Sequence, residues 1–140
     1  TLFPYTTLFR SLKHTVQRSR PTGIRLVEAD GYSFPSGHSS ISTAIGIVLI
    51  YFILKRMKNK KIAYLLSGFI FIYLILVGVS RVSVGVHYPT DVIGGWFIAI
   101  LWSYISITAY KFCMSKGLNE YLDKHFTIKL NIFKHKSNSN

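Results

Sequence analysis

Three long apolar runs dominate the pattern of hydrophobic and polar positions. They cover residues 36–54, 62–79 and 91–110, and polar side chains are rare within them. Each run is roughly 20 residues long, which is about the length of helix that crosses ~30 Å of hydrocarbon. A helix at the surface of a soluble protein would carry a polar face. The pattern therefore predicts three transmembrane helices and an all-α, integral-membrane helical bundle.

The charges between the runs orient this predicted bundle. The link at residues 55–61, KRMKNKK, is mostly Lys and Arg, and further lysines occur in the tail at 113–140. Short basic loops stay on the cytoplasmic side of a membrane. We therefore expect a multi-pass protein of the cell membrane with a cytoplasmic basic tail. Residues 33–38 and 80–91 are then expected on the same, extracytoplasmic face.

The overall charge fits a membrane surface better than a nucleic acid. The chain has 17 Lys and Arg, five Asp and Glu, and a net charge of +12. Its basic residues flank apolar runs and do not alternate with aromatics on a polar domain, so no nucleic-acid partner is expected. Five scattered carboxyl groups can hardly build a two-metal centre, so no metal or other cofactor is expected. The single cysteine, Cys113, excludes an internal disulfide.

The start of the chain is unusual. Residues 1–11, TLFPYTTLFRS, match a one-frame translation of a widely used sequencing adapter. We interpret them as an artefact, exclude them from the fold prediction, and expect the natural protein to extend upstream. The membrane domain is then predicted over residues 12–112.

The start of the first run and a basic segment offer groups that would bind phosphate. The helix starting near PSGHSS presents backbone amides and the positive end of its dipole. Ser36 is the expected N-cap, and Gly37 lets the backbone approach an oxyanion. The segment KHTVQRSRP, residues 13–21, brings cations to a face that should be poor in them. Its cations are Lys13, Arg18 and Arg20.

Two histidines belong to the same face. His38 follows Gly37, and His87 lies in the link that also contains Arg81 and Asp91. One imidazole can attack phosphorus while a carboxylate orients it, and the other can protonate the leaving oxygen. Spacing alone does not decide which histidine does which. A simpler interpretation is that Arg81 extends to the membrane interface, His87 lies in a hydrated loop, and Asp91 or Thr90 caps the third run.

These residues resemble the three-part signature of the type 2 phosphatidic acid phosphatase superfamily, the lipid phosphate phosphatases. The signature reads KxxxxxxRP, PSGH and SRxxxxxHxxxD. The matching residues are Lys13, Arg20 and Pro21; Pro35, Ser36, Gly37 and His38; and Ser80, Arg81, His87 and Asp91. The motifs occur in order, and the resemblance covers roughly residues 12–110.

The resemblance implies a role for each matched residue. His87 would be the nucleophile that forms a phosphohistidine, Asp91 would orient it, and His38 would be the general acid. No metal would be required. Membrane members usually have six transmembrane helices, so the chain would hold the last three, preceded by a loop carrying the first motif. The residues implied to bind the phosphoryl oxygens are Lys13, Arg20, Ser36, Gly37, Ser80 and Arg81.

The implied activity is hydrolysis of a lipid phosphate or diphosphate at the outer face of a bacterial membrane. Undecaprenyl diphosphate, phosphatidylglycerol phosphate and phosphatidate are the candidate substrates, and the expected partners are this substrate and membrane lipids. The oligomeric state is left open. One alternative is a non-catalytic membrane fragment that binds anionic lipid. The related vanadium haloperoxidases are soluble, which the three runs argue against, and a serine hydrolase is disfavoured because the chain has no GxSxG motif.

Overall fold

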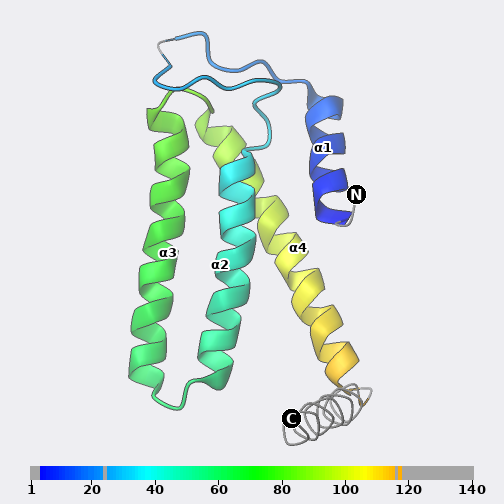
Figure 1. Cartoon of the computed structure of the whole chain (residues 1–140), viewed down its shortest axis with the longest axis vertical. Helices are drawn as coiled ribbons and strands as arrows, with labels where there is room; N and C mark the ends of the chain where they lie inside the picture. The colour runs from blue at the N-terminus through cyan, green and yellow to red at the C-terminus, as the bar shows by residue number, and fades with distance from the viewer. Residues whose placement is uncertain (1–3, 24, 116, 118–140) are drawn as a thin grey trace, which may run out of the picture. The chain divides into compact units, whose positions relative to one another are not determined.

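Four helices make up the regular structure of the described residues (Figure 1). The computed structural model describes residues 4–23, 25–115 and 117. The helices are α1 (Pro4–Val16), α2 (Gly37–Arg56), α3 (Lys60–Ser83) and α4 (Pro89–Ser115). The described residues form no strand, so the predicted all-α class is confirmed. Helices α2, α3 and α4 are each long and apolar enough to cross a membrane, and each contains most of one predicted run.

The chain divides into two compact units, residues 1–104 and 105–140. Helix α4 runs from the first unit into the second. Every residue of the predicted site belongs to the first unit. Most of the predicted tail at 113–140 lies outside the described residues.

Local chemistry explains where two of the long helices begin. Asn59 caps α3, because its side-chain oxygen accepts hydrogen bonds from the amides of Lys61 and Ile62 at 3.1 and 3.3 Å. Helix α4 begins at Pro89, a favourable residue for a first helical position. The Asp91 carboxylate reaches back to accept the Tyr88 amide at 2.9 Å, which is one half of a capping box. Of the two predicted caps, Asp91 therefore makes this contact.

The start of α2 differs from the prediction. Ser36 occupies the N-cap position, but no side chain caps this helix. The Ser36 hydroxyl lies 3.0 Å from the Ser39 hydroxyl instead. The first turn of α2 therefore keeps backbone amides that no capping side chain satisfies.

Within the first unit, three helix ends meet. The start of α2, the end of α3 and the start of α4 gather at one end, with residues 17–23 and 25–36 running across them (Figure 1). Backbone hydrogen bonds join these parts, since the Leu26 amide donates to the Val84 carbonyl at 3.1 Å and the Ser36 amide to the Asp91 carbonyl at 3.0 Å. The predicted common face of residues 33–38 and 80–91 is confirmed as a common end of the helices.

Small residues let the three long helices approach closely. A Cβ on Gly46 of α2 would lie 2.7 Å from Leu74 of α3, and one on Gly78 of α3 would lie 2.7 Å from Trp96 of α4. Large apolar side chains point outward, such as Phe69, which is 63% exposed. Small residues at the contacts and large apolar ones outside are typical of helices packed in lipid.

The first motif begins on a helix, whereas a loop was expected. Lys13 lies in the last turn of α1. This helix includes residues 4–11, which were excluded from the prediction because they match the adapter. The Phe9 ring lies beside Gly37 at the start of α2, 3.4 Å from where a Cβ would stand. Helix α1 therefore contacts the start of α2.

Candidate active site

His87, in the loop between α3 and α4, and Asp91, in the first turn of α4, form a buried pair. His87 is 6% exposed and Asp91 is fully buried. Nδ1 of His87 lies 3.5 Å from Oδ2 of Asp91, beyond ordinary hydrogen-bond length, and it has no hydrogen-bond partner among the described residues. The imidazole therefore faces a carboxylate that can orient it after a small shift.

The surroundings of His87 favour its neutral form. Burial lowers the pKa of His87 below its ordinary value, and the positive charges of Arg20 and Lys13 lower it further. The carboxylate of Asp91 opposes this by raising the pKa, but burial is the largest effect. At neutral pH the imidazole therefore keeps the lone pair that a nucleophile needs.

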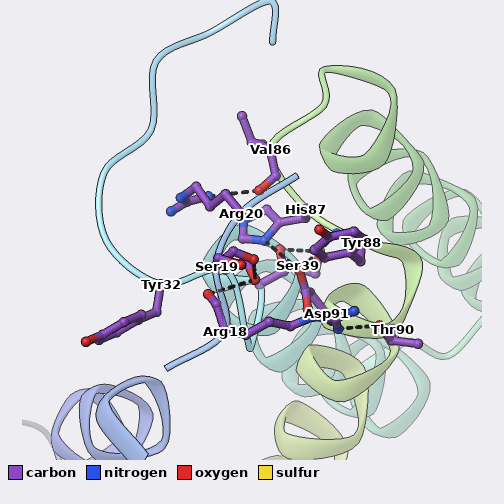
Figure 2. Close-up of polar contacts among 12 residues, drawn as sticks. Arg18, Ser19, Arg20, Tyr32, Ser39, Val86, His87, Tyr88, Thr90 and Asp91 are labelled. Carbon is purple, nitrogen blue, oxygen red and sulfur yellow. Dashed lines mark hydrogen bonds and ion pairs between the residues drawn. The ribbon is translucent and has the colours of Figure 1, made fainter. Parts of the chain in front are cut away.

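Arg18 is a member of this cluster that the motifs did not identify. Its Nη1 donates to Oδ1 of Asp91 at 2.8 Å and to the Thr90 hydroxyl at 2.6 Å (Figure 2). Its guanidinium lies 4.1 Å from the centre of the Tyr88 ring. The sequence offered one signal, a third cation in the segment KHTVQRSRP. Its partner lies 73 positions away, so only the fold shows the pair.

The two cations of the first motif hold backbone carbonyls. Arg20 donates to the carbonyls of Gly31, Asp30 and Val86 at 3.0, 2.8 and 3.0 Å, and Nζ of Lys13 donates to the Tyr32 carbonyl at 2.6 Å. These bonds fix the 30–32 segment beside the α3–α4 loop. A guanidinium has five N–H groups, so Arg20 retains two beyond these three bonds.

Four further motif residues, Gly37, His38, Ser80 and Arg81, border a cleft between α2 and α3. Its volume is about 510 Å³. His38 is exposed at its polar end, where Nε of Arg81 lies 3.4 Å from the Ser80 hydroxyl. His87, Asp91, Lys13 and Arg20 are not among its lining residues. The lining residues are Gly37, His38, Ile41, Ser42 and Ile45 of α2, and Tyr73, Val77, Ser80 and Arg81 of α3.

The predicted residues thus form two groups, a buried cluster around His87 and a cleft group around His38. Ser36 joins them, because it precedes the cleft residue Gly37 and its amide donates to the Asp91 carbonyl. Gly95 of α4 permits this contact, since a Cβ there would lie 2.8 Å from the Ser40 hydroxyl and 3.0 Å from the Ser36 carbonyl oxygen. The start of α2 is therefore held directly against α4.

These two groups suit chemistry on a phosphate group. The buried cluster offers a neutral imidazole facing a carboxylate, and cations lie around it. The cleft group offers a second histidine and an arginine at the end of an apolar groove. In the described part of the chain, no three His, Cys, Asp or Glu side chains group so as to hold a metal ion.

Proteins of similar sequence carry the names of lipid phosphate phosphatases. The chain is 41% identical over 98 residues to phosphatidylglycerophosphatase B of Bacillus subtilis (strain 168), covering 67% of this chain and 47% of that protein. It is 34% identical over 87 residues to an undecaprenyl-diphosphatase of Sulfolobus acidocaldarius, covering 62% of this chain and 38% of that protein. The chain thus spans about half the length, or less, of these curated relatives.

Two crystal structures share the fold. A transmembrane PAP2 type phosphatidylglycerolphosphate phosphatase from Bacillus subtilis superposes with a TM-score of 0.63 and 36% identity, over 76% of this chain and 53% of that chain. LpxE of Aquifex aeolicus gives a TM-score of 0.61 and 30% identity, over 74% of this chain and 61% of that chain. The family model described as the PAP2 superfamily matches residues 3–115. With most of its length matched, the chain belongs to the PAP2 superfamily.

Proposed function

We propose that the protein is a metal-independent phosphatase of lipid phosphates or diphosphates that works through a phosphohistidine. The observation that carries the proposal is the buried His87–Asp91 pair. Burial keeps the imidazole neutral, and the carboxylate stands where it can stabilise the imidazolium formed when the ring attacks. Kinship with phosphatases at 30% identity and above supports the same activity.

The proposed reaction has two steps. Nε2 of His87 attacks phosphorus while Nδ1 faces Asp91, and the bond from phosphorus to the leaving oxygen breaks. His38 gives that oxygen a proton. Neutral His38 then takes a proton from a water molecule, the water oxygen attacks phosphorus, and the phosphorus–nitrogen bond breaks to release phosphate and neutral His87. A positioned general acid contributes about 10²- to 10⁴-fold to such a reaction.

The phosphoryl oxygens would be held by the other motif residues. The uncapped amides at the start of α2 favour an anion, and the two free N–H groups of Arg20 can each add a hydrogen bond. Fixed donors of this kind stabilise the charge that develops in the transition state. The proposed ligands of the phosphoryl group are Lys13, Arg20, Ser36, Gly37, Ser80 and Arg81.

The cleft supports a lipid as the substrate. Below its polar end it is lined by apolar side chains, including Ile45, Tyr73 and Val77. A hydrocarbon chain would fill this groove while its phosphate stays at the polar end. Phosphatidylglycerol phosphate, undecaprenyl diphosphate and phosphatidate are the proposed substrates, and the first two agree with the names of the relatives.

We place the site on the extracytoplasmic side of the cell membrane. The turn between α2 and α3 lies at the opposite end of these helices from the site (Figure 1). It belongs to the basic link at residues 55–61, and short basic loops stay in the cytoplasm. The same rule puts the lysine-rich C-terminal tail in the cytoplasm. The proposed partners are membrane lipids and the lipid substrate. No nucleic-acid partner is proposed.

A phosphate-release assay in lipid bilayers tests this proposal. With a chelator present, the chain should release phosphate from phosphatidylglycerol phosphate or undecaprenyl diphosphate. With ³²P-labelled substrate, an alkaline denaturing quench should trap label on the protein in a form that is stable in base and lost in acid. His87→Asn should abolish both signals. His14→Asn is the matched control, because His14 is an exposed histidine of α1 whose ring makes a T-shaped contact with the Tyr32 ring.

Two results would contradict the proposal, namely turnover that survives in His87→Asn, or turnover that the chelator removes. The alternative is a non-catalytic module that binds anionic lipid. It is favoured by the bonds of Lys13 and Arg20 to backbone carbonyls, since these cations then serve to order a loop. Binding to phosphatidate vesicles without phosphate release would support this alternative.

A further inference from the structure

Arg18 occupies a position that the first motif leaves unspecified, yet it makes the closest charged contact to Asp91. We propose that Arg18 is a positioning residue, which holds Oδ1 of Asp91 so that Oδ2 faces His87. The inference rests on the proposed function for its kinetic consequences only. Its structural basis is the contact of Asp91 with both Arg18 and His87 (Figure 2).

The carboxylate of Asp91 is engaged on both sides. Oδ1 accepts the bond from Arg18 at 2.8 Å. Oδ2 accepts the amide of Tyr88 at 2.9 Å and lies 3.5 Å from Nδ1 of His87. Rotation of an aspartate about its terminal torsion is soft, so bonds to both oxygens are needed to fix the plane. Without Arg18, only the Tyr88 amide would orient a fully buried carboxylate.

Arg18 is itself held at both ends. Its carbonyl oxygen accepts bonds from the Ser33 amide and hydroxyl at 2.8 and 3.2 Å, and Ser33 is fully buried. Its guanidinium bonds to Thr90 and lies over the Tyr88 ring. A surface ion pair gains little when its side chains must first be ordered. Here the neighbouring contacts already order Arg18, so the pair with Asp91 is preorganised.

Loss of Arg18 should affect His87 in two ways. The carboxylate would be free to rotate, so the imidazole would be oriented for less of the time. Its charge would also act more fully on the imidazolium, because no cation would neutralise Oδ1, and this should raise the pKa of His87. The other charged side chains that act on His87 are Lys13 of α1 and Arg20 of the loop, and both would remain.

An NMR titration of the imidazole nitrogens of His87, on the whole chain in micelles, tests the inference. Arg18→Gln should raise the titration midpoint of His87 by about half a unit to one unit. Arg18→Lys keeps the positive charge but loses the planar guanidinium. The His87 midpoint in this variant should therefore lie between those of the wild type and Arg18→Gln. Arg25→Gln is the matched control, because Arg25 is an exposed arginine of the same loop whose Nε donates to the Pro21 carbonyl and whose charge is not among those that shift the pKa of His87. It should leave the midpoint unchanged.

Kinetics give a second readout. In Arg18→Gln, kcat should fall by about 10- to 100-fold, by analogy with the loss that follows removal of a group orienting a metal-bound histidine. KM should change by no more than about threefold, because no substrate contact is removed. Arg18→Lys should recover part of kcat.

Three results would overturn the inference. The first is an unchanged His87 midpoint in Arg18→Gln. The second is a raised KM with unchanged kcat, which would make Arg18 a substrate-binding residue. The third is a lower melting temperature with no change in midpoint, which would give it a purely structural role. If Arg18→Gln fails to fold, Thr90→Val removes one acceptor of Arg18 and should shift the midpoint in the same direction, by less.

The titration needs no turnover. If the wild-type chain releases no phosphate, the proposed phosphatase function is refuted, and the effect of Arg18 on the His87 midpoint can still be measured. If the wild-type chain is active and Arg18→Gln leaves the His87 midpoint unchanged, only the inference about Arg18 is refuted.

Discussion

The two histidines of the site occupy contrasting environments. His87 is 6% exposed and faces a fully buried carboxylate, whereas His38 is exposed at the polar end of a cleft between α2 and α3. The sequence places both on one face and shows no such difference. Their burial matches two separate tasks, since a nucleophile must be neutral and oriented, and a general acid must exchange protons with a departing group and with water.

The buried cluster around His87 and the cleft around His38 also differ in the kind of contacts that they contain. The buried cluster is fixed by charged contacts, with Arg18 on Asp91 and Arg20 on the loop carbonyls. The cleft is bordered mainly by apolar side chains and, under the proposed function, would admit the substrate. If this division is correct, substitutions in the two regions should differ in kind as well as in size.

The largest expected effect distinguishes the two histidines by leaving group. His87→Asn should reduce phosphate release to background for every substrate, because no covalent intermediate can form. His38→Asn should cost about 10²- to 10⁴-fold with an alkyl phosphate. It should cost far less with p-nitrophenyl phosphate, whose leaving group departs without a proton. Steady-state kinetics on both substrates measure this.

His14→Asn again serves as the control and should match the wild type. An equal loss in His38→Asn with both substrates would refute the assignment of His38 as the acid. If the activity lost in His87→Asn depends on the leaving group, then His87 would be the acid and His38 the nucleophile.

The next effect concerns pH. Because burial, Arg20 and Lys13 lower the pKa of His87, kcat/KM should fall on the acid side only below the ordinary value of 6.5. The same shift contributes stability that is present above pH 6.5 and lost as pH falls through the lowered pKa. Asp91→Asn should move this acid limb lower still, since the carboxylate raises the pKa.

In the His38→Asn background with p-nitrophenyl phosphate, which needs no general acid, an alkaline limb should come from Lys13. Burial, followed by the charge of Arg20, lowers its pKa below 10.5, so phosphate binding should weaken as pH rises towards that value. Lys13→Arg should move the alkaline limb upward and leave the acid limb in place. Profiles of kcat/KM from pH 4 to 11 measure both limbs, and an acid limb above 6.5 would contradict the environment described for His87.

The smallest effect tests the contact that joins the two regions. Gly95→Ala places a Cβ 2.8 Å from the Ser40 hydroxyl and 3.0 Å from the Ser36 carbonyl oxygen. The strain of such overpacking is about 1–3 kcal/mol, so the melting temperature in micelles should fall by several degrees. Gly68→Ala is the matched control, because Gly68 of α3 has no atom within 4 Å of its Cβ position. Equal melting temperatures for the two variants would show that the contact is not tight.

Much of the fold could be predicted from the sequence, because membrane helices are constrained by length and hydropathy alone. The runs at 36–54, 62–79 and 91–110 each lie almost wholly within an observed helix. Helix α1 was missed because excluding residues 1–11 left only a few of its positions, too few to reveal a helical period. The uncapped start of α2 was also missed, since the Ser36 hydroxyl has a competing partner in Ser39.

The candidate site could be predicted only in part. The motifs specify the residue types that the chemistry needs, and the structure brings His87 and Asp91 together. Arg18 could not be found, because its role depends on a contact across 73 positions. The separation of His38 from the buried cluster also depends on packing, through the close approach at Gly95, and no spacing along the chain expresses it.

Arg20 illustrates how few side chains such a site needs. Three of its five donors tie Asp30, Gly31 and Val86 together, and under the proposed function the other two would bind the oxyanion. Loop order and ligand binding would then depend on one planar group, so they could not be tuned independently. A lysine at this position could supply the charge, but its compact ammonium lacks the planar array of donors that holds the three loop carbonyls. We therefore expect position 20 not to tolerate Arg20→Lys, although this exchange preserves the charge.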